Sequence, residues 1–153
     1  MNAKFFKNVY YRESGAIVST LTKGGTYPDY TFNGFTKLPG SVDAATMIPE
    51  PAVETPADGA ATNRVDAEKV PVEITVSDLT SGEIATLRGL INEKLDIVFI
   101  DPDQPSVAFA AFGVRVYVKP DISAGAAPKL VISGARSYGM GVATLPLQFI
   151  TVS

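Results

Sequence analysis

The chain has 153 residues and a mass of 16.2 kDa, and 46% of its residues are hydrophobic. That is the length of one domain with its own core, so we expect a single domain over residues 1–153. The chain contains no Cys, which excludes disulfides and thiolate nucleophiles, and no His, the commonest metal ligand and general base. We therefore expect a protein that is not an enzyme and that uses no metal and no cofactor.

Charge is distributed unevenly along the chain. The net charge is +3 over residues 1–40, −4 over residues 41–62 and −2 over residues 63–153. A basic segment followed by an acidic one is compatible with head-to-tail association of identical copies, but chance at this charge density explains it better. The total of −3 disfavours a general nucleic-acid binder. No apolar run is long enough for a signal peptide or a membrane helix, so we expect no membrane partner.

The first part of the chain shows short β patterns and then an irregular stretch. Residues Ala16–Leu21 are β-branched and predict a strand, and the Gly-containing residues 22–26 predict a turn. Residues 27–37 predict a half-buried hairpin arm in which Tyr30 and Phe32 alternate with polar residues. From residue 39 to residue 62, four prolines and the absence of aromatic residues predict a long loop.

Regular patterns resume after this stretch. Residues Lys69–Ser77 alternate, with four apolar residues from Val70 to Val76 on one face, and Pro71 suggests an edge strand or a strand start. Thr80 and Glu83 have the spacing of a capping box. An apolar stripe at helical spacing follows and predicts a helix over 81–94; its members are Ile84, Leu87, Leu90 and Ile91.

Four further strands are predicted after the helix, over 95–100, 107–118, 129–136 and 143–152. In the second of them, strict alternation places the even-numbered residues from Ala108 to Val118 on the core face and Ala111 on the opposite face. The short connections favour antiparallel pairing. The fold class is therefore mainly β: an antiparallel β-sandwich or strongly curved sheet with one flanking α-helix and a long Pro-rich loop at about 39–62.

Few residue groups indicate chemistry. Asp96, Asp101 and Asp103 form the only carboxylate cluster, and the Asp-Pro-Asp sequence is more typical of a turn than of a calcium site. Gly139 and Gly141 indicate a tight turn, because no helix follows them. Tyr and Phe residues between 10 and 35 could stack on bases, but a packed hairpin or a protein interface explains them better.

The order of elements resembles the tail tube (major tail) proteins of long-tailed bacteriophages. The alternating strand Lys69–Ser77 leads directly into the capped helix Thr80–Lys94, and the strand Leu95–Ile100 follows. The ending Thr144-Leu-Pro-Leu-Gln-Phe-Ile-Thr-Val152 is similar to the terminal strand of that family, in which an apolar residue, Pro, an apolar, a polar and an aromatic residue follow one another. The resemblance covers most of the chain from Val65 onward, and the loop at 39–62 sits where such proteins often carry a ring-stacking loop.

The resemblance implies a structural virion subunit. Such subunits form hexameric rings that stack into a tube, contact other tail proteins and let DNA pass without specific binding; they are made in the host cytoplasm and reside in the virion tail. The alternatives are a head decoration protein, a tail completion protein or a monomeric ligand-binding β-sandwich. We expect residues 4–11 to act in assembly rather than in folding, and the acidic loop to order between stacked subunits. The expected inter-subunit contacts are Lys4, Phe5, Phe6, Lys7, Tyr10, Tyr11, Asp43, Glu50, Glu54 and Asp58.

Overall fold

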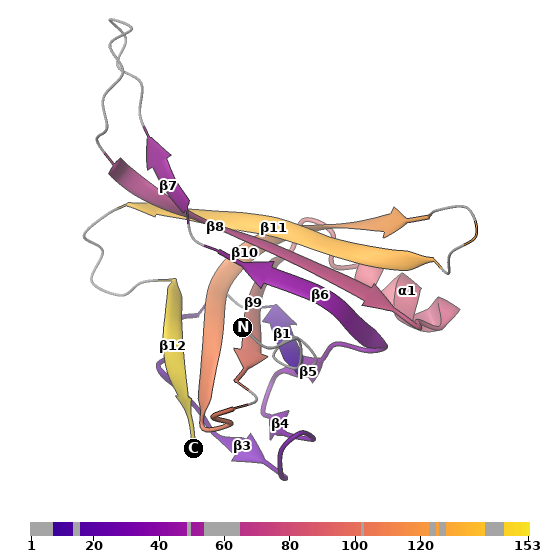
Figure 1. The fold of residues 1–153 in the computed structure, drawn as a ribbon, viewed down its shortest axis with the longest axis horizontal. Helices are drawn as coiled ribbons and strands as arrows, with labels where there is room; N and C mark the ends of the chain where they lie inside the picture. The colour runs from indigo at the N-terminus through magenta and orange to yellow at the C-terminus, as the bar shows by residue number, and fades with distance from the viewer. Residues whose placement is uncertain are drawn as a thin grey trace, which may run out of the picture.

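The computed structural model (Figure 1) describes residues 8–13, 16–48, 50–53, 65–101, 103–122, 125, 128–139 and 146–153. In chain order the elements are β1 (Val9–Glu13), β2 (Thr20–Leu21), β3 (Lys23–Gly24), β4 (Thr31–Phe32), β5 (Thr36–Lys37), β6 (Ser41–Met47), β7 (Glu50–Val53), β8 (Val65–Ser77), α1 (Ser81–Arg88), β9 (Lys94–Ile100), β10 (Val107–Asp121), β11 (Lys129–Gly139) and β12 (Leu147–Val152).

One curved sheet of ten strands dominates the molecule. Its order is β5-β1-β9-β10-β11-β8-β6, with β12 also paired to β10, β2 to β12 and β7 to β8. Every pairing in it is antiparallel except β2 with β12. Strands β6, β8 and β11 run along the long axis, whereas β9, β12 and the first half of β10 run across it (Figure 1). The predicted class, mainly β and antiparallel with one helix, is confirmed.

Two apolar clusters fill the interior. The larger cluster joins Val9 of β1, Ile97 of β9 and Ile74 of β8, so the two ends of the curved sheet pack on each other as in a sandwich. The smaller cluster lies on the other side of β9 and β10, where Phe112 and Phe32 are buried. Each face of the β9–β10 region is therefore a core face, which explains why Leu95–Ile100 is buried throughout and apolar except at Asp96.

A β-bulge at Gly113 changes the cluster that the even-numbered residues of β10 face: up to Phe112 they face the smaller cluster, and from Val114 they face the larger one. The register between β9 and β10 shifts between Ala111 and Val114, and Gly113 has a φ of +69°. A bulge adds one residue to one strand and so reverses the alternation beyond it. Ala111 and Val114 consequently both face the larger cluster, while Phe112 faces the smaller one. Ala111 lies on the face opposite Ala110 and Phe112, as predicted, but that face is also covered, so the prediction of a single core face is wrong.

Helix α1 begins as predicted but is shorter. Thr80 Oγ1 accepts from the N–H of Glu83 and the Glu83 carboxylate accepts from the N–H of Thr80, which completes the capping box. The helix ends at Arg88 rather than at residue 94, because Gly89 caps it and Asn92 takes a φ of +69°. Leu87 and Leu90 are buried, and Ile84 and Ile91 pack against the larger cluster from its rim.

Strand β1 belongs to the core, contrary to the expectation for residues 9–11; residues 4–7 lie outside the described residues. Strand β1 lies between β5 and β9, and Val9 and Tyr10 are 0% and 2% exposed. Residues 9–11 therefore act in folding, and a deletion through residue 11 would remove a core strand. By contrast, the predicted strand Ala16–Leu21 is reduced to Thr20–Leu21, and β3 occupies part of the predicted turn at 22–26.

The predicted long loop is also partly wrong. Within residues 39–62, β6 and β7 pair with β8, and Val42, Ala45 and Met47 are buried. A register shift between Val42 and Ala44 breaks the alternation, which hid this strand in the sequence. The remainder of the predicted loop, at 54–62, lies outside the described residues.

Pro71 lies inside a central strand rather than at the edge of the sheet. Pairing of β8 with β6 ends at the pair Met47–Val72, and pairing with β7 begins at Glu50–Lys69. Pro71 thus faces a break between two partner strands, where a missing N–H costs no ladder hydrogen bond. Along the part of the chain that is described, no helix is long and apolar enough to cross a membrane.

Candidate assembly surface

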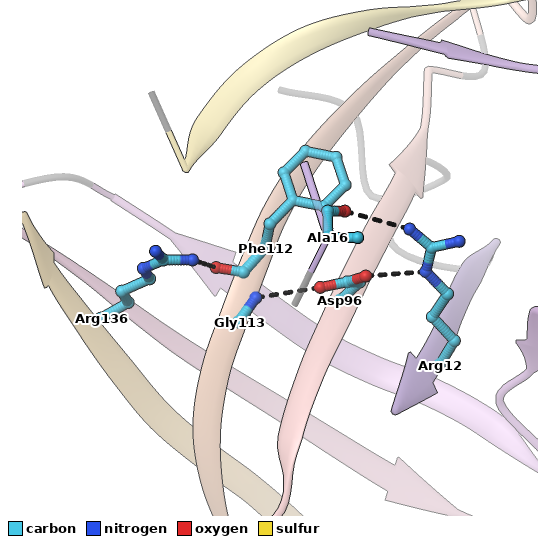
Figure 2. A network of polar contacts seen from close by, with 6 residues as sticks. All are labelled: Arg12, Ala16, Asp96, Phe112, Gly113 and Arg136. Atoms are coloured by element: carbon cyan, nitrogen blue, oxygen red, sulfur yellow. Dashed lines mark hydrogen bonds and ion pairs between the residues drawn. The ribbon is translucent and has the colours of Figure 1, made fainter. Parts of the chain in front are cut away.

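The corner where β10 changes direction is held by a polar network (Figure 2). Asp96 of β9 is fully buried, and its Oδ1 accepts the N–H of the bulge residue Gly113 at 3.0 Å. Its Oδ2 accepts from Arg12 Nε of β1 at 2.7 Å, and Arg12 Nη2 donates to the carbonyl of Ala16. A buried carboxylate requires such partners, because desolvation without them is costly.

A second arginine holds the other side of the same corner. Arg136 Nη1 of β11 donates to the carbonyl oxygen of Phe112 at 2.6 Å. Bulges leave backbone groups without ladder partners, and here side chains from β9 and β11 supply them. The network therefore fixes the angle between the two parts of the sheet, and with it the shape of the subunit.

One face of the β6–β8–β11–β10 part of the sheet is open to solvent. Residues that alternate with the core positions of these strands point away from the larger cluster, and most are small, hydroxylated or charged. We call this set the outer face; it comprises Ala44, Thr46, Lys69, Pro71, Glu73, Thr75, Arg115, Tyr117, Lys119, Val131, Ser133, Ala135 and Ser137. Val131 is buried beneath its neighbours on this face, and the charged members are three cations and one anion, Glu73.

The outer face holds a shallow groove rather than an enclosed pocket. The groove has a volume of about 490 Å³ and lies where the turn after α1 meets β10 and β11. Arg115 Nη1 donates to the Asn92 carbonyl on its wall, and Tyr117 is 55% exposed. The wide opening and the few polar groups do not suit tight binding of a small molecule, which favours an extended interaction surface.

This part of the sheet has one open edge. Among the described residues, β6 pairs only with β8, so its far side presents backbone N–H and C=O groups that can pair with another chain. The far side of β10 is covered beyond Arg115: the Val116 N–H donates to the Glu93 carbonyl, the Val116 carbonyl accepts from the Asn92 N–H, and Arg88 donates to the Val118 carbonyl. The β6 edge is therefore a candidate contact between copies of the chain.

The residues expected to contact neighbouring subunits fall into different environments. Tyr10 is a core residue whose hydroxyl donates to the Tyr30 carbonyl at 2.8 Å, so its assignment as a surface contact is wrong. Burial, with smaller contributions from Asp29 and two nearby tyrosines, raises the pKa of Tyr10 to about 12. Tyr11 packs partly against the larger cluster, and burial followed by the charge of Glu13 raises its pKa.

The acidic candidates are only partly described. Asp43 Oδ2 lies 3.2 Å from Lys129 Nζ, and its Oδ1 accepts from Ser77 Oγ, so its partners are within the subunit. Glu50 begins β7. The other candidates lie outside the described residues; they are Lys4, Phe5, Phe6, Lys7, Glu54 and Asp58.

The carboxylate cluster does not converge on a metal site. Asp96 is engaged at the corner, and Asp101 Oδ1 accepts the backbone N–H groups of Asp103 and Gln104, as the predicted turn requires. In the described ranges no group of three or more Asp, Glu, His or Cys side chains could hold a metal ion. Gly139 ends β11, and the rest of its predicted turn lies outside those ranges.

Several features of the structure were missed from the sequence. Tyr138 donates to Glu68 Oε2 at 2.8 Å across the β8–β11 pair, and burial and this hydrogen bond raise the pKa of Tyr138 to about 12. Phe149 is 74% exposed although it lies in an apolar strand. A glycine inside a strand pattern indicates a bulge, so Gly113 could have been recognised from the sequence. Arg136 and Tyr138 bind Phe112 and Glu68, which are distant in the sequence, so no local pattern predicts these hydrogen bonds.

Comparisons with known proteins bear on the fold. No family model matches the sequence, and no curated protein matches it. A similar solved structure is a chain from the tail of an empty GTA particle, obtained by helical refinement with C6 symmetry. The two chains align over 99% of each, with a TM-score of 0.50 and 13% sequence identity. At this identity, the likeness shows that the fold is shared.

Proposed function

We propose that the protein is a structural subunit of a phage-type tail tube, in which identical copies form hexameric rings and the rings stack. The observation that carries the proposal is the shared fold over nearly all of both chains with a subunit of a C6-symmetric particle tail. The subunit would reside in the virion tail, contact other tail proteins and catalyse no reaction. DNA would pass through the tube without specific contacts.

The geometry of the sheet supports ring closure. The order β6-β8-β11-β10 contains four strands, and each neighbouring pair is antiparallel. Because the number is even, the β10 side of one copy placed beside the β6 edge of the next keeps the antiparallel order of the strands. The turn after α1 and Arg88 hold the backbone of Val116 and Val118 on that side, so neighbouring copies would meet through the open β6 edge and this turn. A repeated head-to-tail contact of this kind gives a closed ring when its rotation divides a full turn.

In such a ring the outer face would line the channel. The larger cluster and α1 lie on the opposite side of these strands, so they would face away from the lumen. The charged side chains of the outer face are three cations, Lys69, Arg115 and Lys119, and one anion, Glu73. Contacts of these cations with DNA phosphates would be independent of sequence, which is compatible with passage of any DNA. Among the expected contacts, Lys4, Phe5, Glu54 and Asp58 stay predictions within this proposal.

The test is the size and shape of the purified full-length chain at increasing concentration. The proposal predicts rings or tubes with sixfold symmetry by electron microscopy and a matching increase in mass by light scattering. A lysine at an exposed strand edge opposes edge pairing. Thr46→Lys in β6 should therefore remain a folded monomer, whereas Thr36→Lys, an exposed threonine in β5, should assemble normally.

The contrary results identify the alternatives. A particle near 16.2 kDa at every concentration would favour the monomeric ligand-binding module. Trimeric or other closed particles that never stack would favour a head decoration or tail completion protein. Normal tubes from Thr46→Lys would remove the β6 edge from the contact.

A further inference from the structure

A row of apolar side chains crosses four strands and ends on the surface. Val9 of β1 is in register with Phe99 of β9, Phe99 with Phe109 of β10, and Phe109 with Phe149 of β12. Directly paired residues share a face of the sheet. Burial decreases along the row: Val9 and Phe99 are 0% and 1% exposed, Phe109 is half-buried and Phe149 is 74% exposed.

The exposed end of this row is continuous with the core. The rings of Phe109 and Phe149 pack with their centroids 4.8 Å apart, and Phe109 contacts the larger cluster. Val107, half-buried, is the next residue on the same face. We call these three residues the Phe149 patch. Single exposed apolar residues are ordinary, but an aromatic pair that extends the core outward offers a surface a partner can cover.

Carboxylates border the Phe149 patch. Asp101 N–H donates to the Val107 carbonyl, which places Asp101 beside Val107 at one side of the patch, and exposed Asp103 follows in the same turn. Asp101 Oδ1 accepts from the backbone N–H groups of Asp103 and Gln104 in this turn. A partner that fits this place therefore presents aromatic side chains next to cations.

We propose that the Phe149 patch receives the segment Lys4–Lys7 of a second copy of the chain, a contact that rests on the proposed ring and tube assembly. The segment reads Lys-Phe-Phe-Lys. Its two phenylalanines match the apolar patch, and its two lysines match the carboxylates of Asp101 and Asp103. The contact would be heterologous, because the segment and the patch are different surfaces of each subunit.

The segment before Asn8 is too short to reach Phe149 of its own subunit, which favours a second copy as its source. The segment leaves β1 at Asn8, whose carbonyl accepts from the N–H of Ile100 at 3.1 Å. Strands β1 and β12 are three places apart in the sheet, or about 14 Å at the usual strand spacing. Two residues beyond Asn8 span at most about 7 Å and three at most about 11 Å, so neither Phe6 nor Phe5 can carry its backbone over Phe149 of its own subunit. Phe109, two places from β1, lies within the reach of Phe5, so the contact with Phe149 is the one that requires a second copy.

Cysteine cross-linking tests the contact directly, because the chain has no Cys of its own. Phe5→Cys and Phe149→Cys are made in separate chains, mixed, assembled and oxidised. The proposal predicts a cross-linked species of twice the subunit mass, formed only in the assembled fraction. Phe5→Cys mixed with Ile122→Cys, at a residue 72% exposed, is the matched control and should not cross-link. No cross-link to position 149, or one found only within a single chain carrying both cysteines, would overturn the proposal.

Substitution supplies a second measurement. Phe149→Ser should raise the concentration needed for assembly at least tenfold while leaving the thermal midpoint within a few degrees, and Ile122→Ser should change neither. Asp103→Lys should weaken assembly, and Lys4→Glu in the same chain should restore it. If the wild type forms tubes and Phe149→Ser does so equally well, this inference fails and the proposed function stands. If the wild type stays monomeric at every concentration, both fail.

Discussion

The corner network around Asp96 gives the sharpest test of how this fold is held. Asp96→Ala removes the acceptor of both the Gly113 N–H and the Arg12 guanidinium. Hydrogen bonds to a charged group contribute about 1.5–3 kcal/mol each. The Arg12 side chain is 21% exposed and keeps its bond to the Ala16 carbonyl, so part of the loss is recovered in water. We expect Asp96→Ala to lower the free energy of unfolding by about 3 kcal/mol.

Three further variants distinguish the contribution of the Asp96 charge from that of its oxygen as a hydrogen-bond acceptor. Asp96→Asn keeps an oxygen for Gly113 and should cost less than Asp96→Ala, about 1–2 kcal/mol. Arg12→Ala removes the cation beside a fully buried carboxylate and should cost about 3–5 kcal/mol. The double variant of Arg12 and Asp96 should cost less than the sum of the single variants by at least about 1 kcal/mol, because both report on one contact.

The assay is urea unfolding followed by far-ultraviolet circular dichroism, with Asp121→Ala as the control at an exposed aspartate. The control should stay within about 0.5 kcal/mol of the wild type. The reasoning is refuted if Asp96→Ala behaves like the control, or if the Arg12 and Asp96 variants are additive.

Three further predictions concern the core, the bulge and the tyrosines. Leu87→Ala removes three carbons from a fully buried site, at about 0.8 kcal/mol each before the cavity is counted, and should cost about 2–5 kcal/mol in urea unfolding. Gly113→Ala places a side chain at a φ of +69° and should cost about 1–2 kcal/mol from the backbone alone. The pKa of Tyr10 and of Tyr138 is raised from 10.0 to about 12, so the folded state favours the neutral phenols. Stability should be full below pH 10 and fall as the pH rises toward about 12, and Tyr10→Phe and Tyr138→Phe should each reduce that fall.

Each of these has a contrary outcome. A change under about 0.5 kcal/mol for Leu87→Ala would mean that α1 does not pack as described. Gly82→Ala, at an exposed helical site with open space around it, is the control for Gly113→Ala and should be neutral or stabilising. Equal or larger losses at Gly82 would refute the bulge interpretation. Alkaline unfolding profiles that are identical in the wild type and both Phe variants would refute the assignment to these tyrosines.

Local sequence determined the elements whose cause lies within a few residues. The capping box of Thr80 and Glu83 fixes the start of α1, because both partners belong to one turn of the chain. The alternation of Lys69–Ser77 gives the correct core face of β8, and the carboxylate of Asp101 forms its turn with the two N–H groups that follow it. The fold class followed from the number and spacing of such patterns.

Only the tertiary structure decided the features that depend on distant partners. Tyr10 is a core residue because Tyr30 and Phe32, twenty and more positions later, surround it, and nothing in residues 4–11 indicates that. Strand β6 exists because β8 supplies its hydrogen bonds, and a bulge at Asp43 hides its alternation. The bulge at Gly113 turns β10 from one cluster to the other only because Asp96 supplies the lost backbone partner from another strand. The alternation of apolar and polar residues predicts the faces of a single strand. The faces of a bulged strand, and the exposure of Phe149, depend instead on which other strands pack beside that strand.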